Sequence, residues 1–207
     1  REMRLLVTGG AGFVGANFTH RAVAKGEQVI VYDSLTYAGN PDNLSDLVGQ
    51  DGYRFVHADV RDADALSTAM AECDAVVHFA AESHVDRSIL DPAPFVSTNC
   101  GGTATLCEVA LRVGVNRVVH VSTDEVYGSV VEGSSTAEDR LIPSSPYAAS
   151  KAASDLIALA YYHTHGLPVL VTRSSNNYGP RQYPEKVIPL FVTNLLEGRP
   201  VPLYGDG

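Results

Sequence analysis

One tyrosine and one lysine in this chain are spaced so that they could carry out acid–base chemistry together. Tyr147 and Lys151 are four residues apart in a stretch that begins at Ser145-Pro146, where the proline suits the first turn of a helix. Residues four apart lie on the same helix face. A cation beside a phenol favours the phenolate, so we expect the pKa of Tyr147 to fall from about 10 toward the working pH. Such a phenolate could take a proton from a sugar hydroxyl. In isolation, an exposed tyrosine and lysine on a surface helix would give the same pattern.

A glycine-rich turn near the N-terminus could hold a pyrophosphate. Gly9, Gly12 and Gly15 follow the apolar run Arg4–Thr8 at the spacing GxxGxxG and open a helix-like stretch. Without a Cβ atom the backbone can turn sharply there and approach a phosphate at the positive end of the helix. A tight strand-to-helix connection without a ligand would also use glycines, but the surrounding strand and helix favour a dinucleotide site.

Asp33 ends the next apolar run and suggests which dinucleotide is bound. A carboxylate at this position can accept hydrogen bonds from both ribose hydroxyls. It would repel a 2′-phosphate, and no arginine or lysine occurs between residues 34 and 40. The sequence therefore predicts NAD rather than NADP.

Two adjacent acids, Asp124 and Glu125, follow Ser122-Thr123 at the end of another apolar run. Two carboxyl groups in different environments can act as an acid and a base. Loss of water next to a ketone needs both, a base for the carbon-bound proton and an acid for the leaving hydroxyl. Two solvated loop acids, one of them capping a helix, are the alternative.

These groups need a scaffold, and the apolar pattern predicts one. Continuous Val-rich runs fit strands that are buried on both faces; they are Arg4–Thr8, Gln28–Asp33, Tyr53–Ala58, Ala75–Ala80, Arg117–Ser122 and Val169–Arg173. Apolar positions recur at helical spacing near 13–25, 62–72, 92–113 and 144–165, with shorter stretches at Pro41–Leu47 and Glu185–Leu196. This alternation predicts an α/β fold with a doubly wound parallel (Rossmann) sheet and right-handed crossovers.

Together these motifs resemble the extended short-chain dehydrogenases/reductases of the NAD-dependent epimerase/dehydratase family, which act on nucleotide sugars. Four stretches are similar to its dTDP-glucose 4,6-dehydratases: Ala80–Ile89, Ser122–Gly128, Asn176–Pro180 and Pro184–Pro189. The resemblance implies a hydro-lyase that converts dTDP-glucose to dTDP-4-keto-6-deoxyglucose. It does so by C4 oxidation, loss of water across C5–C6 and hydride return to C6, with NAD tightly bound and regenerated in each turnover. The 4-epimerases of the family lack an adjacent Asp–Glu pair here.

The resemblance also assigns residues to roles. Asp124 would be the acid and Glu125 the base, within a catalytic set of Thr123, Asp124, Glu125, Tyr147 and Lys151. The cofactor-binding set is Gly9, Gly12, Phe13, Val14, Gly15, Asp33, Ser34, Leu35, Thr36, Asp59, Val60, Ala80, Ala81, Thr98, Tyr147, Lys151 and Asn177, with Asp59 accepting from the adenine amino group. The substrate-binding set is Ser83, His84, Thr123, Asn176, Lys186 and Val187. Thr98 as an ordinary helix hydroxyl and Asn176-Asn177 as a simple turn are the alternatives. No metal is expected.

Family members continue beyond the length of this chain, and the segment after Leu196 reads as a strand and a turn that end at Gly207. We therefore expect a dinucleotide-binding domain with the catalytic residues over 1–175. The start of a sugar-nucleotide-binding part is expected over 176–207, with the rest of that small C-terminal part largely absent. The choice of dTDP over UDP rests on the resemblance alone.

Other functions on this scaffold stay open. A UDP-sugar 4,6-dehydratase, a 4-epimerase and a UDP-glucuronate decarboxylase share it, and some proteins of this fold are non-catalytic dinucleotide sensors. A sensor would not need Tyr147, Lys151 and the acid pair.

Charge and cysteine content limit partners and location. With 15 Lys and Arg against 24 Asp and Glu, the net charge is -9, which argues against nucleic acid and anionic membranes as partners. Cys73, Cys100 and Cys107 form no CxxC pair and suit a reducing compartment. No leader or membrane-length apolar run is evident, so we expect a cytoplasmic protein. The helices near 92–113 and 144–165 carry apolar and small residues on more than one face, which predicts a homodimer through them; examples are Ala104, Leu111, Leu156, Ala160 and Tyr161.

Overall fold

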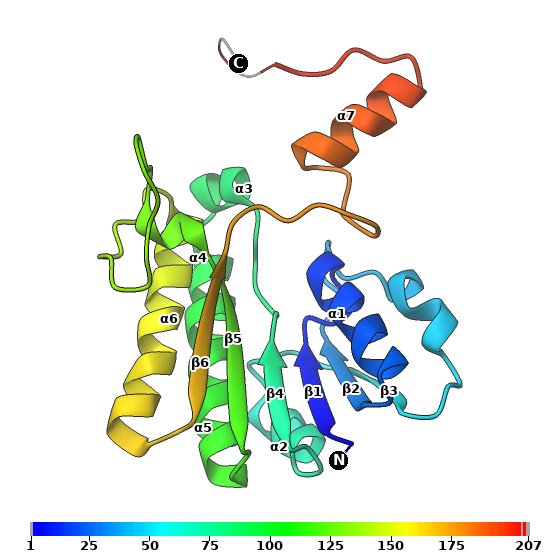
Figure 1. Cartoon of the computed structure of the whole chain (residues 1–207), viewed down its shortest axis with the longest axis vertical. Coiled ribbons are helices and arrows are strands. Elements are labelled where there is room, and N and C mark those ends of the chain that lie inside the picture. Colours follow the sequence, from blue (N-terminus) through cyan, green and yellow to red (C-terminus); the bar gives the residue numbers. More distant parts are fainter. Residues whose placement is uncertain (1, 204, 206–207) are drawn as a thin grey trace.

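A parallel sheet of six strands forms the centre of the molecule (Figure 1). The structure is a computed structural model that describes residues 2–203 and 205. The sheet order is β3-β2-β1-β4-β5-β6. The strands are β1 (Arg4–Thr8), β2 (Gln28–Asp33), β3 (Tyr53–His57), β4 (Ala75–His78), β5 (Arg117–Thr123) and β6 (Val169–Ser174). The order changes direction between β1 and β4, and a crevice at the carboxyl ends of the strands is expected at such a point. The predicted doubly wound parallel sheet is confirmed, with β3 and β4 ending earlier than predicted and β5 and β6 one residue later.

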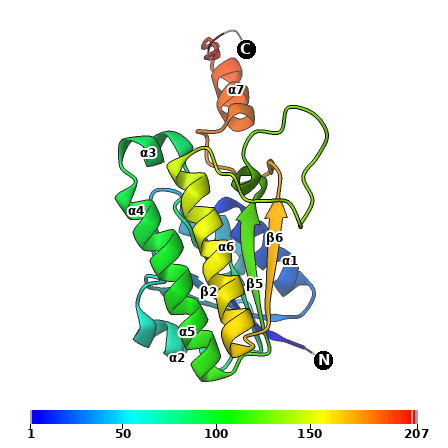
Figure 2. The ribbon, with the colours of Figure 1, turned by 90° about the vertical axis from the view of Figure 1, so that its left-hand side faces the viewer.

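Three helices cover one face of the sheet. They are α2 (Ala63–Met70), α5 (Thr103–Val113) and α6 (Pro146–His165). Leu66, Leu106 and Ala158 from these helices are fully buried against inward-facing residues of the strands. Figure 2 shows α5 and α6 side by side along the length of the sheet.

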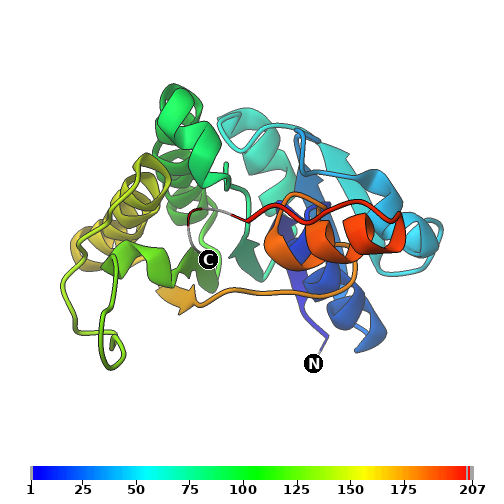
Figure 3. The same ribbon diagram turned by 90° about the horizontal axis from the view of Figure 1, so that it is seen from above.

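The opposite face is covered differently in its two halves. Helix α1 (Phe13–Ala24) and the 3-10 helix η1 (Pro41–Leu47) pack on β1 and β2, where Val7 and Val31 are fully buried. Seen from above in Figure 3, α1 and α6 lie on opposite sides of the sheet. On β6, Leu170 points to the α1 side and is 50% exposed.

The stretch predicted as one helix over 92–113 consists of three segments with two kinds of helical turn. Residues Ala93–Phe95 form α4, Val96–Gly102 form a π-helix (η2), and α5 follows directly. Asn99 in the π segment exchanges hydrogen bonds with the backbone of Glu82, at 2.8 and 3.0 Å, and donates to Ser150 Oγ at 2.8 Å. These side-chain bonds hold a wide turn that the apolar spacing alone does not specify.

Three short segments complete the fold. Helix α3 (Val85–Leu90) and the 3-10 turn η3 (Asp124–Tyr127) were not predicted as helices, while α7 (Val187–Leu196) begins two residues later than the predicted stretch. Helix α7 has no buried residue and projects beyond the carboxyl ends of the strands (Figure 1). Within the described part of the chain, every helix is too short or too polar to cross a membrane.

Candidate active site

The glycine turn forms a cradle at the start of α1. A Cβ on Gly9, whose φ is +68°, would lie 2.5 Å from Ala80 N, and one on Gly15 would lie 2.2 Å from Gly9 O. The fold itself therefore requires these two glycines. A Cβ on Gly12 would have its nearest neighbour at 3.4 Å, an ordinary contact. Gly12 caps α1 without a side-chain hydrogen bond and lines the cleft, so its bare backbone leaves space for an anion at the helix N-terminus.

Asp33 at the end of β2 is fixed by the backbone on both of its oxygens. Oδ2 accepts from Ala11 N at 2.9 Å and Oδ1 accepts from Leu35 N at 2.8 Å. Burial raises the pKa of Asp33, and these two N–H groups and His57 oppose that rise. Each oxygen retains acceptor capacity toward the cleft, which is what a ribose diol requires. A Cβ on Gly39 would lie 2.8 Å from Oδ1, so the following loop also needs a glycine beside the carboxylate.

Asp59 follows β3 and is engaged by a neighbour that the sequence analysis did not select. Its Oδ1 accepts from Arg61 Nε at 2.8 Å and from Arg61 N at 2.9 Å. The hydrogen bond from Arg61 holds the pKa of Asp59 below its usual value, against the effect of burial. Asp59 lines the cleft as predicted, but with a guanidinium as its partner. Its role toward adenine stays a prediction.

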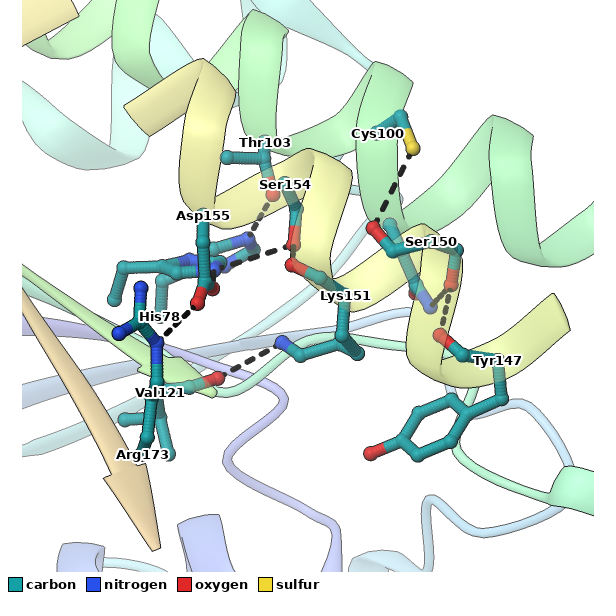
Figure 4. A network of polar contacts seen from close by, with 12 residues as sticks. His78, Cys100, Thr103, Val121, Tyr147, Ser150, Lys151, Ser154, Asp155 and Arg173 are labelled. Atoms are coloured by element: carbon teal, nitrogen blue, oxygen red, sulfur yellow. Dashed lines mark hydrogen bonds and ion pairs between the residues drawn. The ribbon is translucent and has the colours of Figure 1, made fainter. Parts of the chain in front are cut away.

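Lys151 and Tyr147 lie on one face of α6, as their spacing predicts (Figure 4). Lys151 is buried and its Nζ donates to Val121 O at 2.8 Å. Burial lowers the pKa of Lys151 to about 8. The pKa of Tyr147 is raised, first by burial and then by the charge of Glu125, although Thr123 opposes the rise.

The expectation that Lys151 depresses the pKa of Tyr147 is therefore wrong for this geometry. Desolvation of the phenol and the nearby carboxylate outweigh any effect of the ammonium group, which is turned toward a carbonyl oxygen. The pair is placed for proton transfer, but Tyr147 is held as the neutral phenol.

The acid pair sits on η3, directly after β5, and its two members face different surroundings. Thr123 Oγ1 accepts from Glu125 N at 3.2 Å and caps the turn, so neither acid is the cap. Glu125 lines the cleft, and its pKa is raised by burial and by Asp124, while Lys186 opposes the rise. Asp124 Oδ1 accepts from Thr123 Oγ1 at 3.3 Å, and Asp124 lines an adjoining hollow with Tyr127 and Arg173, which Glu125 also borders.

One cleft of about 560 Å³ collects most of the predicted site. It is bordered by the glycine turn, the carboxyl ends of β1, β2, β4 and β5, the start of α6 and the segment 174–188. Every predicted site residue lines it except Leu35, His84 and Asp124. Leu35 packs beside the α1 core, while His84 caps α3 and lies 3.4 Å from Glu185 Oε2.

The structure adds residues that the sequence analysis missed. Those lining the cleft include Arg61, Glu82, Tyr178, Gln182, Tyr183 and Glu185. Glu82, Tyr178 and Glu185 lie inside the stretches that resemble the family, and the other three lie beside predicted site residues or between those stretches. A second missed group joins the buried His120 and Asp155 to the half-buried Arg173. Asp155 and Arg173 lie near Lys151 in Figure 4. Asp155 could have been found, since it follows Lys151 at the same four-residue spacing that links Lys151 to Tyr147.

Comparison with known proteins defines the class of this chain. The NAD dependent epimerase/dehydratase family matches residues 5–207. The chain belongs to this family, which confirms the resemblance seen in its motifs.

Individual relatives narrow the comparison. The dTDP-glucose 4,6-dehydratase of Streptomyces niveus is 54% identical over 99% of this chain, which spans 63% of that relative's length. The crystal structure of DesIV, a dTDP-glucose 4,6-dehydratase from Streptomyces venezuelae with NAD and TYD bound, is 59% identical with a TM-score of 0.97. It covers 99% of this chain and 66% of the DesIV chain. A UDP-glucuronic acid 4-epimerase from Bacillus cereus, in complex with UDP-glucuronic acid and NAD, has a TM-score of 0.94 at 28% identity, with coverage of 99% and 67%. The fold is thus shared across activities, whereas the sequence is much closer to the dehydratases.

Proposed function

We propose that this chain carries the cofactor site and the catalytic groups of an NAD-dependent hydro-lyase that converts dTDP-glucose to dTDP-4-keto-6-deoxyglucose. The observation that carries the proposal is that Glu125, Tyr147 and the glycine turn open onto one cleft. An epimerase needs the glycine turn and the tyrosine but has no use for a half-buried carboxylate beside them.

NAD fits the cradle by two features of this chain. Gly12 leaves room at an uncapped helix N-terminus, and Asp33 retains acceptor capacity, while Arg61 in the same cleft is bonded to Asp59. When bound, NAD supplies the oxidation of C4 and the later reduction of C6. The chain's own groups bind, orient and move protons.

Proton movements follow from the positions of the side chains. Tyr147 would take the C4 hydroxyl proton as the phenolate, so its own phenol proton must leave first, which burial and the charge of Glu125 oppose in this structure. Thr123 lies beside its phenol and Lys151 follows it by one turn of α6. The resulting ketone acidifies C5–H, and Glu125 would remove that proton. A carboxylate whose pKa is raised by burial is a stronger base than one in water, which suits this step.

Asp124 would protonate the leaving C6 hydroxyl. Its side chain is bonded to Thr123 and lies outside the cleft lining, so this role requires a rotation of the side chain about its Cα–Cβ bond. The pairing with Thr123 is a single long hydrogen bond, which such a rotation would break at small cost.

Substrate choice and domain organisation belong to the same proposal. We infer that residues 176–207 begin the sugar-nucleotide-binding part, because Asn176, Lys186 and Val187 enter the cleft from beyond β6. We propose dTDP rather than UDP as the nucleotide of the substrate, because a relative at 54% identity is named for dTDP-glucose.

A homodimer through α5 and α6 also belongs to the proposal. These helices are neighbours, and Leu111 and Leu156 on them are 38% and 58% exposed. Burial of two such leucines per subunit would be favourable in a two-fold interface. A monomeric mass at micromolar concentration would contradict it. The cytoplasmic location stays a prediction.

The experiment that tests the function is incubation of NAD-loaded full-length protein with dTDP-glucose, without free NAD, followed by mass spectrometry and NMR of the sugar nucleotide. We expect loss of one water per molecule, a 4-keto-6-deoxy sugar, and turnover that continues after free NAD is removed. Unchanged mass with inversion at C4 would indicate an epimerase. Release of carbon dioxide from a UDP-glucuronate control would indicate a decarboxylase, and no reaction with any nucleotide sugar would favour a dinucleotide sensor.

A further inference from the structure

Behind Lys151 lies a buried ionic group that the proposed chemistry does not use. Asp155 is 0% exposed and lies one helical turn beyond Lys151 on α6. Arg173 Nε donates to its Oδ2 at 2.8 Å, and His120 Nε2 lies 3.2 Å from its Oδ1 (Figure 4). Burial alone would raise the pKa of Asp155, but His120, Arg173 and Ser122 outweigh it and the pKa is lowered. Asp155 is therefore a carboxylate, and Arg173 is its cationic partner.

His120 does not supply the compensating charge. Burial, and then the charge of Lys151, lower the pKa of His120 to about 4. Its ring packs against that of His78 with the centroids 5.4 Å apart, and Ser154 Oγ lies 3.3 Å from its Nε2. At neutral pH it is a neutral polar contact of Asp155, which leaves Arg173 to balance the charge.

Arg173 also reaches a second element. Its Nη1 donates to the hydroxyl oxygen of Tyr127 at 2.9 Å, and its Cζ lies 5.2 Å from the centre of the Tyr127 ring. Tyr127 is the last residue of η3, the turn that carries Asp124 and Glu125. One guanidinium on β6 thus joins the helix of Tyr147 and Lys151 to the turn of the acid pair.

The rest of η3 is held by its cap, by the loop before α6 and by packing against α6, with Val126 fully buried. Thr123 caps its first residues, and Val126 O accepts from Ile142 N at 3.0 Å in the loop before α6. These contacts fix the height of the turn above β5. Arg173 adds side-chain hydrogen bonds that connect Tyr127, at the end of the turn, with Asp155 on α6.

We propose that Arg173 is a positioning residue that, through Asp155 and Tyr127, sets the distance between Glu125 and Tyr147 in the cleft. The proposal rests on the proposed function, because it assigns the link to the elimination step. Displacement of a base by about 1 Å can slow its step by up to about a hundredfold. Weakening the link should therefore slow elimination and leave the earlier oxidation at Tyr147 nearly unchanged, since Tyr147 is held by α6 itself.

The cleanest variant is Tyr127→Phe. It keeps the ring and the buried Asp155–Arg173 pair, and removes only the hydroxyl that Arg173 contacts. The matched control is Tyr162→Phe, which removes the hydroxyl group of a tyrosine on α6 that is 49% exposed. Both variants would be measured as NAD-loaded full-length protein in single turnovers with dTDP-glucose, following reduced-nicotinamide absorbance for oxidation and solvent deuterium at C5 for proton removal.

For Tyr127→Phe we expect oxidation within about twofold of the parent protein and C5 exchange slowed about tenfold. A second readout is the pH profile of exchange. Glu125 is faced by Asp124 on its own turn, Lys186 before α7 and Tyr147 on α6. A looser turn admits water, so the limb that reports Glu125 should move to lower pH. Unfolding measurements should show little loss of stability.

Three outcomes for Tyr127→Phe overturn the proposal. Oxidation and C5 exchange are both unaffected, both are slowed equally, or exchange is slower while the pH limb that reports Glu125 does not move. If the parent protein itself loses no water from dTDP-glucose, the proposed function fails first. In that case, amide hydrogen exchange of 124–128 still tests the link, because Tyr127→Phe should accelerate it and Tyr162→Phe should not.

Discussion

The two halves of the cleft hold their polar groups by different means. On the β1–β3 side, space and backbone do the positioning: Gly9 and Gly15 permit close approaches of main chain, and Asp33 is fixed by two N–H groups. On the β5–β6 side, side chains act on one another: Arg173 on β6 is bonded to Asp155 on α6, and the charge of Asp155 acts on the buried Lys151. Backbone groups do not titrate near neutral pH, whereas these side chains have shifted pKa values.

The difference has a consequence for what each half tolerates. In the β1–β3 half, a single added methyl group can disrupt the fold or the ligand site, although Asp59 there is also held by the charged side chain of Arg61. In the β5–β6 half, isosteric changes that alter only charge or a proton should have the large effects. The predictions below test this division, in order of decreasing effect.

The largest effect is expected for Tyr147→Phe. This change removes one oxygen from a well-packed ring and should leave the fold intact. It takes away the group that accepts the C4 proton, so oxidation and every later step should fall by about three powers of ten or more. Stopped-flow absorbance of reduced nicotinamide checks it. Normal oxidation in this variant would show that another group accepts the proton.

Glu125→Gln should separate the two stages of the reaction. The amide keeps the shape of the side chain but cannot take the C5 proton. Reduced nicotinamide and a 4-keto sugar nucleotide should accumulate, and product formation should fall by about two to four powers of ten. Solvent deuterium incorporation at C5, followed by NMR, should stop. Product formation at normal speed, without accumulation of reduced nicotinamide, would show that the acid pair has no part in the reaction. It would contradict the dehydratase assignment.

Asp124→Asn should have a smaller effect than Glu125→Gln. The acid lies outside the cleft lining and is needed only for departure of the C6 hydroxyl, so we expect a loss of about a hundredfold. C5 exchange should continue while water loss slows. Equal loss of exchange in both variants would mean that the two carboxylates act as one unit.

A pair of glycine variants tests the β1–β3 half, where space and backbone position the polar groups. The Cβ of Gly15→Ala would meet Gly9 O, so this variant should lose about 1–3 kcal/mol of unfolding free energy. Gly12→Ala meets only an ordinary contact and should unfold like the parent, but its methyl group enters the cleft and should weaken NAD binding. Denaturant melts and NAD titration of both proteins separate the two effects. If Gly12→Ala binds NAD normally, the cradle is not where the pyrophosphate lies.

The smallest effect is a pH dependence of opposite sign in the two halves. The pKa of Asp155 is lowered in the fold, so its contribution to stability is present above the unfolded value of about 3.9 and is lost as pH falls below it. The pKa of Asp33 is raised, so its contribution is greatest at low pH and declines as pH rises through the folded pKa. Denaturant unfolding of Asp155→Asn and Asp33→Asn between acidic and neutral pH should give slopes that deviate from the parent in opposite directions. Deviations of the same sign would contradict the division.

The β1–β3 half of the cleft was the easier one to predict from sequence. Glycines with fixed spacing, and an aspartate closing a strand, are local signals because the groups they serve are backbone atoms a few residues away. The strands followed from the continuous apolar runs for a similar reason, whereas their order in the sheet was not predicted. The main error in the predicted helices was the stretch 92–113, which was predicted as one helix. Asn99 and its distant partners Glu82 and Ser150 instead hold a π-helix within it.

In the β5–β6 half, the sequence predicted which residues line the cleft but not the environment that sets their pKa values. Tyr147, Lys151 and Glu125 are in the cleft, yet the pKa of Tyr147 moves upward because burial and Glu125 act on it, and neither is visible in a spacing of four. The Asp155–Arg173–Tyr127 link joins residues 18 and 46 positions apart. Such pairs are formed by the sheet and have no local pattern, apart from the repeat of four along α6.

The π segment fixes how this protein can vary in length. A π turn spans one more residue than an α turn, so Val96–Gly102 holds a residue that a regular helix would not accommodate. Deleting a single residue there would let α4 run into α5 as one regular helix. Because each α-helical residue rotates the chain by about 100°, Asn99 would then turn away from Glu82 on one side or Ser150 on the other. Homologous chains should accept substitutions across this segment far more readily than gaps, and an alignment that opens a gap here is aligning the wrong residues.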